Sequence, residues 1–115
     1  MPATSAASLL SSTGPFSQHI KDFESRPSQQ RMAGLVERAI VDQASIAVEI
    51  AAGSGKTLAY LVPAILSGRR VIISTASHQL QDQLVKRDIA LVQTALSKPF
   101  KVASLKGREQ YFCPY

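Results

Sequence analysis

The stretch SIAVEIAAGSGKTLAYLVP, residues 45–63, has the pattern of a buried strand, a glycine-containing loop and an amphipathic helix. Its first six residues, SIAVEI, form a short run rich in β-branched residues, which favours a buried strand that ends at the loop. Beyond the loop, apolar residues recur at helical spacing: Leu58, Leu61, Val62, Ile65 and Leu66. Pro63 predicts a kink or an unwound last turn, and Gly68 predicts the end of the helix.

The loop carries the second half of the phosphate-binding pattern G-x-x-x-x-G-K-[ST]. In such a loop, backbone amides at a strand-to-helix turn surround phosphate groups, the Lys reaches the β and γ phosphates, and the hydroxyl binds Mg²⁺. The residues in these positions are Ala52, Gly53, Ser54, Gly55, Lys56 and Thr57. Ile50 replaces the first Gly, so we expect ATP binding that is present but weakened. A plain glycine turn is the structural alternative.

The rest of the chain continues the alternation of helices and strands. Helical spacing predicts an amphipathic helix over residues 28–42 and a second helix over 77–96, with a break near Arg87–Asp88. The runs RRVIIST (69–75) and FKVASLKG (100–107) predict two further strands. Successive βαβ units give the predicted fold class, α/β, with a parallel sheet flanked by helices.

Composition places the chain among globular cytoplasmic proteins. It has 115 residues, of which 45% are hydrophobic and 18% charged, enough for one domain. Apolar runs are too short to cross a membrane, and residues 1–20 lack Lys and Arg, so we expect a flexible leader and not a signal peptide. The net charge of +5 permits an anionic partner such as nucleic acid or nucleotide, although an ordinary basic surface explains it equally well.

Several motifs in order resemble the DinG/YoaA/XPD-type iron–sulfur DNA helicases of superfamily 2, the YoaA-like members most of all. RPSQQRMA (26–33) resembles the family's glutamine motif R-x-x-Q-x-x-M, which implies that Gln29 reads adenine. EIAAGSGKTLAYLVPAIL (49–66) is similar to the family's EAGTGTGKTLAYLVPAL, with Ile50, Ala51 and Ala52 as departures. The resemblance implies an incomplete RecA-like P-loop domain over residues 21–105.

Two further motifs extend the resemblance towards DNA and an iron–sulfur cluster. VIISTASHQLQDQLVKRDI (71–89) resembles motif Ia, which implies that Thr75 and Ser77 contact single-stranded DNA; an ordinary helix N-cap is the alternative. SLKGREQYFCPY (104–115) is similar to the family's LLKGRSNYLC, which implies that Cys113 is the first ligand of a [4Fe–4S] cluster and that residues 106–115 begin the cluster region. Seen without the family, Cys113 is an ordinary structural thiol.

The sequence leaves two hypotheses about function. In the first, the residues belong to an ATP-dependent DNA helicase that moves 5′ to 3′ in DNA repair, with ATP, Mg²⁺ and single-stranded DNA as ligands. In the second, the chain is a truncated nucleotide-binding stub or an inert relic. No adjacent acidic pair follows an apolar strand, so we expect no ATP hydrolysis by the 115 residues alone. A small P-loop kinase or other NTPase fits the loop but not the flanking motifs.

Overall fold

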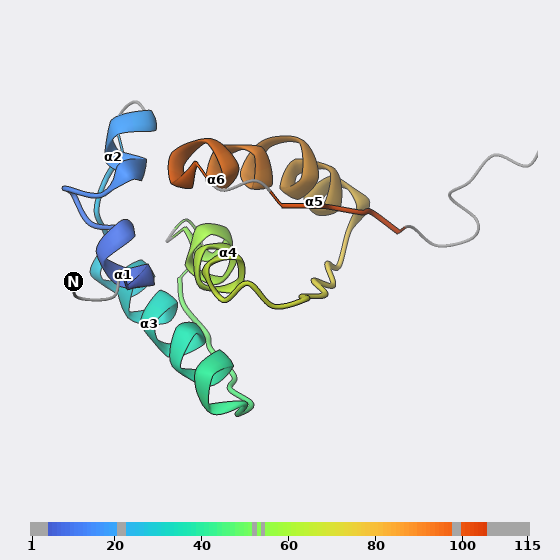
Figure 1. Ribbon diagram of the computed structural model, residues 1–115, viewed down its shortest axis with the longest axis horizontal. Helices are drawn as coiled ribbons and strands as arrows, with labels where there is room; N and C mark the ends of the chain where they lie inside the picture. Colours follow the sequence, from blue (N-terminus) through green and yellow to red (C-terminus); the bar gives the residue numbers. More distant parts are fainter. Residues whose placement is uncertain (1–4, 21–22, 52, 54, 98–99, 106–115) are drawn as a thin grey trace, which may run out of the picture.

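The computed structural model describes residues 5–20, 23–51, 53, 55–97 and 100–105. Within these ranges all regular secondary structure is helical (Figure 1). The elements are α1 (Ala6–Leu9), α2 (Pro15–His19), α3 (Pro27–Asp42), α4 (Lys56–Leu66), α5 (His78–Gln83), the π-helix η1 (Leu84–Asp88) and α6 (Ile89–Leu96). No helix among the described residues is long and apolar enough to span a bilayer.

Helix α4 lies between α3 on one side and α6 on the other, and its contact with α3 is the more extensive (Figure 1). The helix predicted over residues 28–42 is confirmed as α3, which begins at Pro27, where a missing N–H has no helical acceptor to lose. Helix α4 runs through Pro63 and ends at Leu66. Gly68 follows with φ 68°, a left-handed conformation that closes the helix as predicted.

The predicted break in the helix over residues 77–96 is a turn of π-helix. Helix α5 passes into η1 at Leu84, and α6 begins at Ile89, so the irregular turn contains Arg87 and Asp88. Asp88 is only 7% exposed, and its Oδ1 lies 3.3 Å from Nε of the exposed Arg87. The irregular turn thus carries a buried carboxylate towards α4, against which η1 packs.

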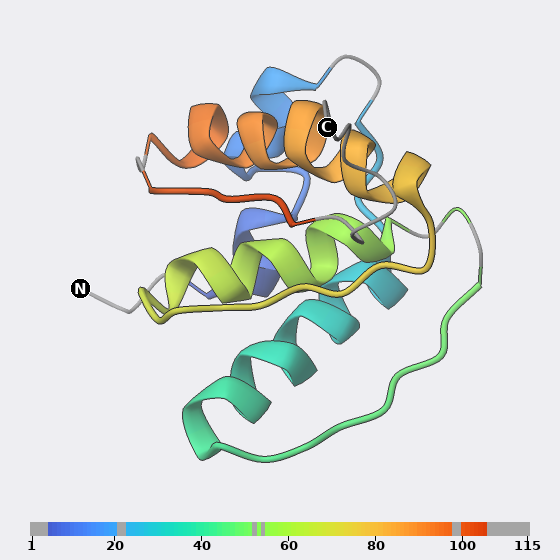
Figure 2. The same cartoon turned by 90° about the vertical axis from the view of Figure 1, so that its right-hand side faces the viewer.

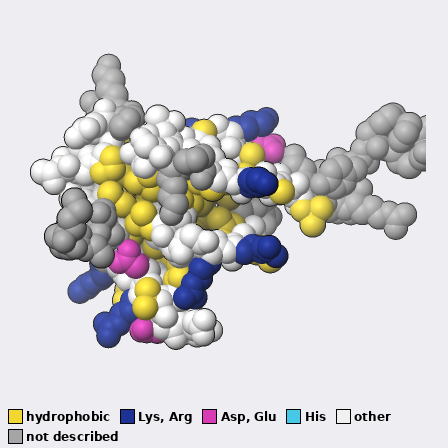
Figure 3. Space-filling view, in the orientation of Figure 1, with side chains coloured by type: hydrophobic (Ala, Val, Ile, Leu, Met, Phe, Trp, Pro, Cys, Tyr) yellow, Lys and Arg dark blue, Asp and Glu magenta, His cyan; other side chains and the backbone are white. Residues whose placement is uncertain are grey.

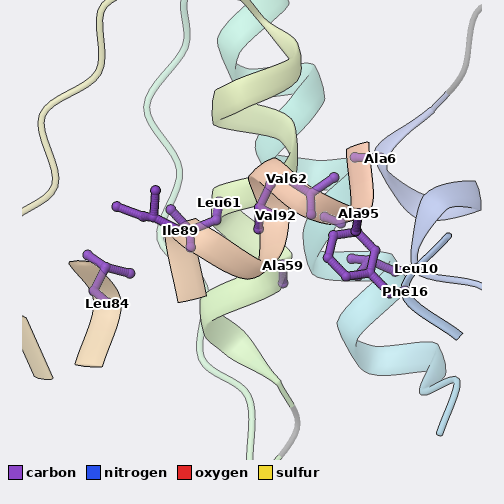
Figure 4. Packing of buried hydrophobic residues seen from close by; sticks show 11 residues of the cluster. Ala6, Leu10, Phe16, Ala59, Leu61, Val62, Leu84, Ile89, Val92 and Ala95 are labelled. Atoms are coloured by element: carbon purple, nitrogen blue, oxygen red, sulfur yellow. The ribbon is translucent and has the colours of Figure 1, made fainter. Parts of the chain in front are cut away.

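The core joins the helices through apolar side chains (Figure 4). Its fully buried members include Phe16, Leu61, Val62 and Val92. Residues 5–20, in the segment expected to be a flexible leader, contribute Ala6, Leu10 and Phe16, each with 0% exposure. The backbone N–H of Ala6 also donates to Glu37 Oε2 of α3 at 2.9 Å, which ties α1 to α3.

The predicted parallel sheet is wrong. Residues 45–50, 71–75 and 100–105 are irregular, and within the described chain no backbone hydrogen bond joins these segments. Figure 2 shows them as separate extended runs. Several of their apolar side chains are exposed, with Ile46 47%, Ile72 93% and Val102 44% exposed, whereas Ile73 and Phe100 pack against the core.

The physical reason is that strand pairing needs a neighbouring backbone, which these segments do not offer one another. Helix side chains bind part of the 100–105 backbone instead. Gln93 Nε2 donates to the carbonyl of Phe100 at 3.0 Å, and Gln81 Nε2 donates to that of Leu105 at 2.8 Å. The RecA-like sheet expected from the resemblance is absent for the same reason over the residues described.

Candidate phosphate-binding site

The glycine loop leads into α4 through two residues in the left-handed region. Gly53 and Gly55 both have φ 80°, which residues with a Cβ rarely adopt. Gly55 is the N-cap of α4. Lys56 is the first residue of the helix and has an exposed side chain, and Thr57, the second residue, is half-buried. The first amides of a helix have no intrahelical acceptor and lie at the positive end of its dipole, so this end of α4 attracts anions.

The space next to the loop differs at its two glycines. A Cβ built on Gly53 would meet none of the described atoms within 4 Å, so the loop is open there. A Cβ built on Gly55 would meet the side-chain amide of Gln29, including its Cδ at 2.9 Å. The open side is where a phosphate could enter. Ala52 and Ser54, also expected to bind ATP, lie outside the described residues.

Two of the departures at the start of the loop, Ile50 and Ala51, do not have a left-handed backbone; the third, Ala52, lies outside the described residues. Among the described residues other than Gly, positive φ occurs at Gln43 and Ser97, so Ile50 and Ala51 have ordinary φ angles. Ile50 is half-buried and lines a hollow of about 600 Å³ with Val48, Met32 and Leu35. The strain that an Ala with positive φ would introduce is therefore not present at Ala51.

Gln29 is attached to the loop and does not line the neighbouring hollow. Its Nε2 donates to the carbonyl oxygen of Gly55 at 3.0 Å, across 26 residues of sequence. The side chain is buried, with the residue 3% exposed. Its Oε1 accepts no hydrogen bond from the described part of the chain, which is unusual for a buried amide oxygen.

Tyr60 and Asp88 extend the polar surroundings of Thr57. Burial raises the pKa of the Tyr60 phenol above its ordinary 10.0; a hydrogen bond with the Thr57 hydroxyl acts in the opposite direction, and the charge of Asp88 raises it further. Neither residue was predicted from the sequence. The i, i+3 spacing of Thr57 and Tyr60 on one helix was the available signal for Tyr60, whereas Asp88 reaches the site only through the tertiary fold.

The residues expected to contact DNA lie beside a second, larger groove. Ser77 is the N-cap of α5 and accepts from the backbone N–H of Leu80 at 3.2 Å, while Thr75 Oγ1 donates to the carbonyl of Ser77 at 3.2 Å. Both line a groove of about 920 Å³ whose charged or titratable side chains are Arg69, His78 and Lys101. Figure 3 shows Lys and Arg side chains around an apolar surface of the molecule.

The residue expected to bind an iron–sulfur cluster, Cys113, is not among those that the structure describes. The rest of residues 106–115 lies outside the described residues as well. Within the described part, no three His, Cys, Asp or Glu side chains gather as metal ligands. The phosphate loop and the groove beside α5 are therefore the sites that the structure presents for analysis.

Comparison with known proteins finds relatives of this sequence that are named helicases. The chain is 46% identical over 107 residues to the ATP-dependent DNA helicase YoaA of Haemophilus influenzae, which covers 93% of this chain and 17% of that protein. It is 45% identical over 100 residues to the ATP-dependent DNA helicase YoaA of Escherichia coli, and the match covers 87% of this chain and 16% of that protein. The Bacillus subtilis protein named 3'-5' exonuclease DinG is 36% identical over 103 residues, and the match covers 86% of this chain and 11% of that protein.

These relatives define a class of proteins, the ATP-dependent helicases and their DinG relatives. Within that class, the chain is a DinG/YoaA-type helicase segment, as the motifs indicated. It spans about a sixth of the length of the YoaA proteins that it matches, at 17% and 16%. No family profile and no solved structure matches the chain.

Proposed function

We propose that this chain supplies the phosphate-binding part of the ATP site of a DinG/YoaA-type DNA helicase. The observation that supports this most strongly is the backbone conformation of the loop that leads into α4. Two glycines with φ 80° lead directly into an 11-residue helix, and the exposed Lys56 is its first residue. The amides of that turn and the Lys ammonium group would donate hydrogen bonds to the phosphate oxygens and stabilise their negative charge.

The other residues at the loop suit the same role. Gly53 leaves open space where phosphate oxygens would approach the backbone. Thr57 lies one position beyond Lys56, where its hydroxyl oxygen would help to hold the Mg²⁺ ion of Mg·ATP. Gln29 is close enough to the loop to take part in nucleotide binding. Ala52 and Ser54 complete the proposed loop from sequence alone.

A titration of Mg·ATP into the 115-residue chain tests this proposal. We expect Lys56→Ala to weaken binding by about tenfold or more, since hydrogen bonds to charged groups contribute about 1.5–3 kcal/mol. Arg38→Ala is the control, because Arg38 is an exposed cation of α3, nine residues beyond the Gln29 whose side chain contacts the loop. An affinity that Lys56→Ala leaves unchanged would contradict the phosphate site.

The wider activity of a helicase is proposed from the relatives' names and the matching motifs. We place ATP-dependent 5′–3′ unwinding in DNA repair, with Thr75 and Ser77 beside the DNA backbone and Cys113 as one ligand of a [4Fe–4S] cluster. The described lining of the larger groove carries Arg69 and Lys101 and no acidic side chain, which supports an anionic ligand there. If it binds single-stranded DNA, Lys101→Ala should weaken binding and reduce its salt dependence by about one charge.

The alternative is a nucleotide-binding stub or inert relic without helicase activity. This alternative predicts nucleotide binding at most, with no DNA-stimulated hydrolysis by the polypeptide that cells produce. Recovering that polypeptide with an antibody against the exposed residues 41–47 and measuring its mass and ATPase activity separates the two. A product at 12.4 kDa favours the stub, and a heavier product with ATPase activity favours the helicase.

A further inference from the structure

We propose that Gln29 is a positioning residue that orients the Gly55–Lys56 peptide towards phosphate, whether or not a base is bound. This rests on the proposed phosphate site and adds a role for Gln29 that does not depend on adenine. The side chain donates from Nε2 to Gly55 O at 3.0 Å, and Gly55 is the N-cap of α4. One amide thereby connects the first turn of α3 to the first turn of α4.

The effect on the phosphate site follows from peptide geometry. The carbonyl of Gly55 and the N–H of Lys56 belong to one planar peptide group, and the described peptides are all trans. The Gly55 carbonyl oxygen accepts from Gln29 Nε2 at 3.0 Å and from the Ala59 N–H of α4 at 3.2 Å, so the Lys56 N–H points to the opposite side of the peptide from these two donors. A donor on the carbonyl also polarises the peptide, which strengthens its N–H as a donor to an anion.

Burial makes this contact well defined. Gln29 is 3% exposed and occupies the space next to the left-handed Gly55 that a Cβ would need. The amide orientation is fixed because Gly55 O is an acceptor only, so Nε2 and not Oε1 must face it. Oε1 accepts nothing from the described residues, so a bound ligand with an N–H group could add a second bond without breaking the first.

A ligand without a base separates this role from base recognition. We would titrate Mg·tripolyphosphate and Mg·ATP into the full chain and into Gln29→Met, which keeps the length of the side chain and removes its donor. We expect both ligands to bind about three- to tenfold more weakly, the range for one lost hydrogen bond. Gln30→Met is the matched control, since Gln30 Nε2 bonds Ser25 Oγ at 3.2 Å on the surface. Circular dichroism would verify that helix content is retained.

A pH-dependent rescue distinguishes a positioning bond from simple packing. In Gln29→Glu a neutral carboxyl group can donate to Gly55 O, whereas a carboxylate cannot, and burial raises the pKa of that carboxyl. Tripolyphosphate binding by this variant, relative to wild type at each pH, should recover as the pH falls from about 8 to about 5, because the carboxyl group becomes protonated.

Each outcome decides a different claim. Loss of ATP binding alone in Gln29→Met, with tripolyphosphate binding unchanged, would overturn the positioning role and leave the phosphate site intact. A pH-independent defect in Gln29→Glu would likewise overturn it. A wild-type chain that binds neither ligand would overturn the proposed function itself, and the positioning role with it.

Discussion

Helix α4 and the segment 71–75 follow one another in the chain and are both rich in apolar residues, but only the helix contains fully buried side chains. In α4, Leu61 is 1% and Val62 0% exposed, whereas in the segment Val71 is 43% and Ile72 93% exposed. A helix satisfies its backbone within itself and can then bury one face against any apolar neighbour. A strand needs a second backbone beside it, and an apolar sequence cannot supply one.

The same contrast explains where the proposed site is well formed. The side of the loop that enters α4 has a defined N-cap and a hydrogen bond to Gln29. The segment that precedes the loop, 45–50, is extended and mostly exposed. A phosphate site built from a helix N-terminus therefore keeps its helical half even though the predicted strand is missing.

The largest expected effect is the removal of a core side chain. Phe16→Ala should destabilise the fold by about 3–5 kcal/mol, because the ring is fully buried among helices. Ile72→Ala should change the free energy of unfolding by no more than about 0.5 kcal/mol, the range for surface positions. Urea denaturation followed by circular dichroism measures both. Equal losses would show that residues 71–75 belong to the core.

The two left-handed glycines should respond differently to a methyl group. Gly53→Ala carries only backbone strain, about 1 kcal/mol, while Gly55→Ala also forces Gln29 to move, which adds about 1–3 kcal/mol. Mg·ATP titration should therefore show the greater loss for Gly55→Ala. Adding Gln29→Ala to Gly55→Ala should relieve part of the instability, as a double-mutant cycle would measure. Strict additivity would contradict the contact.

A smaller gain is expected at the end of α3. Gln43 closes this helix with φ 54°, a conformation that Gly adopts without strain. Gln43→Gly should stabilise the chain by about 0.5 kcal/mol, after allowing for the greater freedom of Gly in the unfolded state. Thermal unfolding is the measurement, with Gln30→Gly inside the helix as a control that should destabilise. A loss of stability in Gln43→Gly would refute this account of the cap.

The smallest effect concerns Tyr60 at high pH. Because folding raises the pKa of its phenol above 10.0, the folded state holds that proton more tightly than the unfolded state. The resulting stability is complete below the ordinary pKa and is lost as pH rises through the raised value. Wild type should thus lose more stability above that pH than Tyr60→Phe does. Identical pH profiles for the two proteins would exclude a contribution from Tyr60.

Local patterns predicted α3, α4 and the helical run that contains η1, because a helix is encoded by neighbours in sequence, but they did not predict α1 and α2, which lie within the segment expected to be a flexible leader. The spacing of apolar residues located α3 and α4, and the polar pair Arg87–Asp88 located the irregular turn η1. The strands failed because pairing depends on distant backbone, and the Val and Ile residues of 71–75 do not say which segment lies beside them. The glycine spacing indicated the loop, but the bond between Gln29 and Gly55 spans 26 residues and is visible only in the fold.

Amide hydrogen exchange of the free chain and of the chain with Mg·ATP tests the central claim most directly. The account predicts slow exchange in α4 and α6, and fast exchange in residues 45–50 and 71–75, because those backbones are unpaired. Mg·ATP should protect the amides of Gly53, Gly55 and Lys56 and leave 71–75 unchanged. Slow exchange throughout 45–50 and 71–75 in the free chain, or no change at the loop with Mg·ATP, would contradict it.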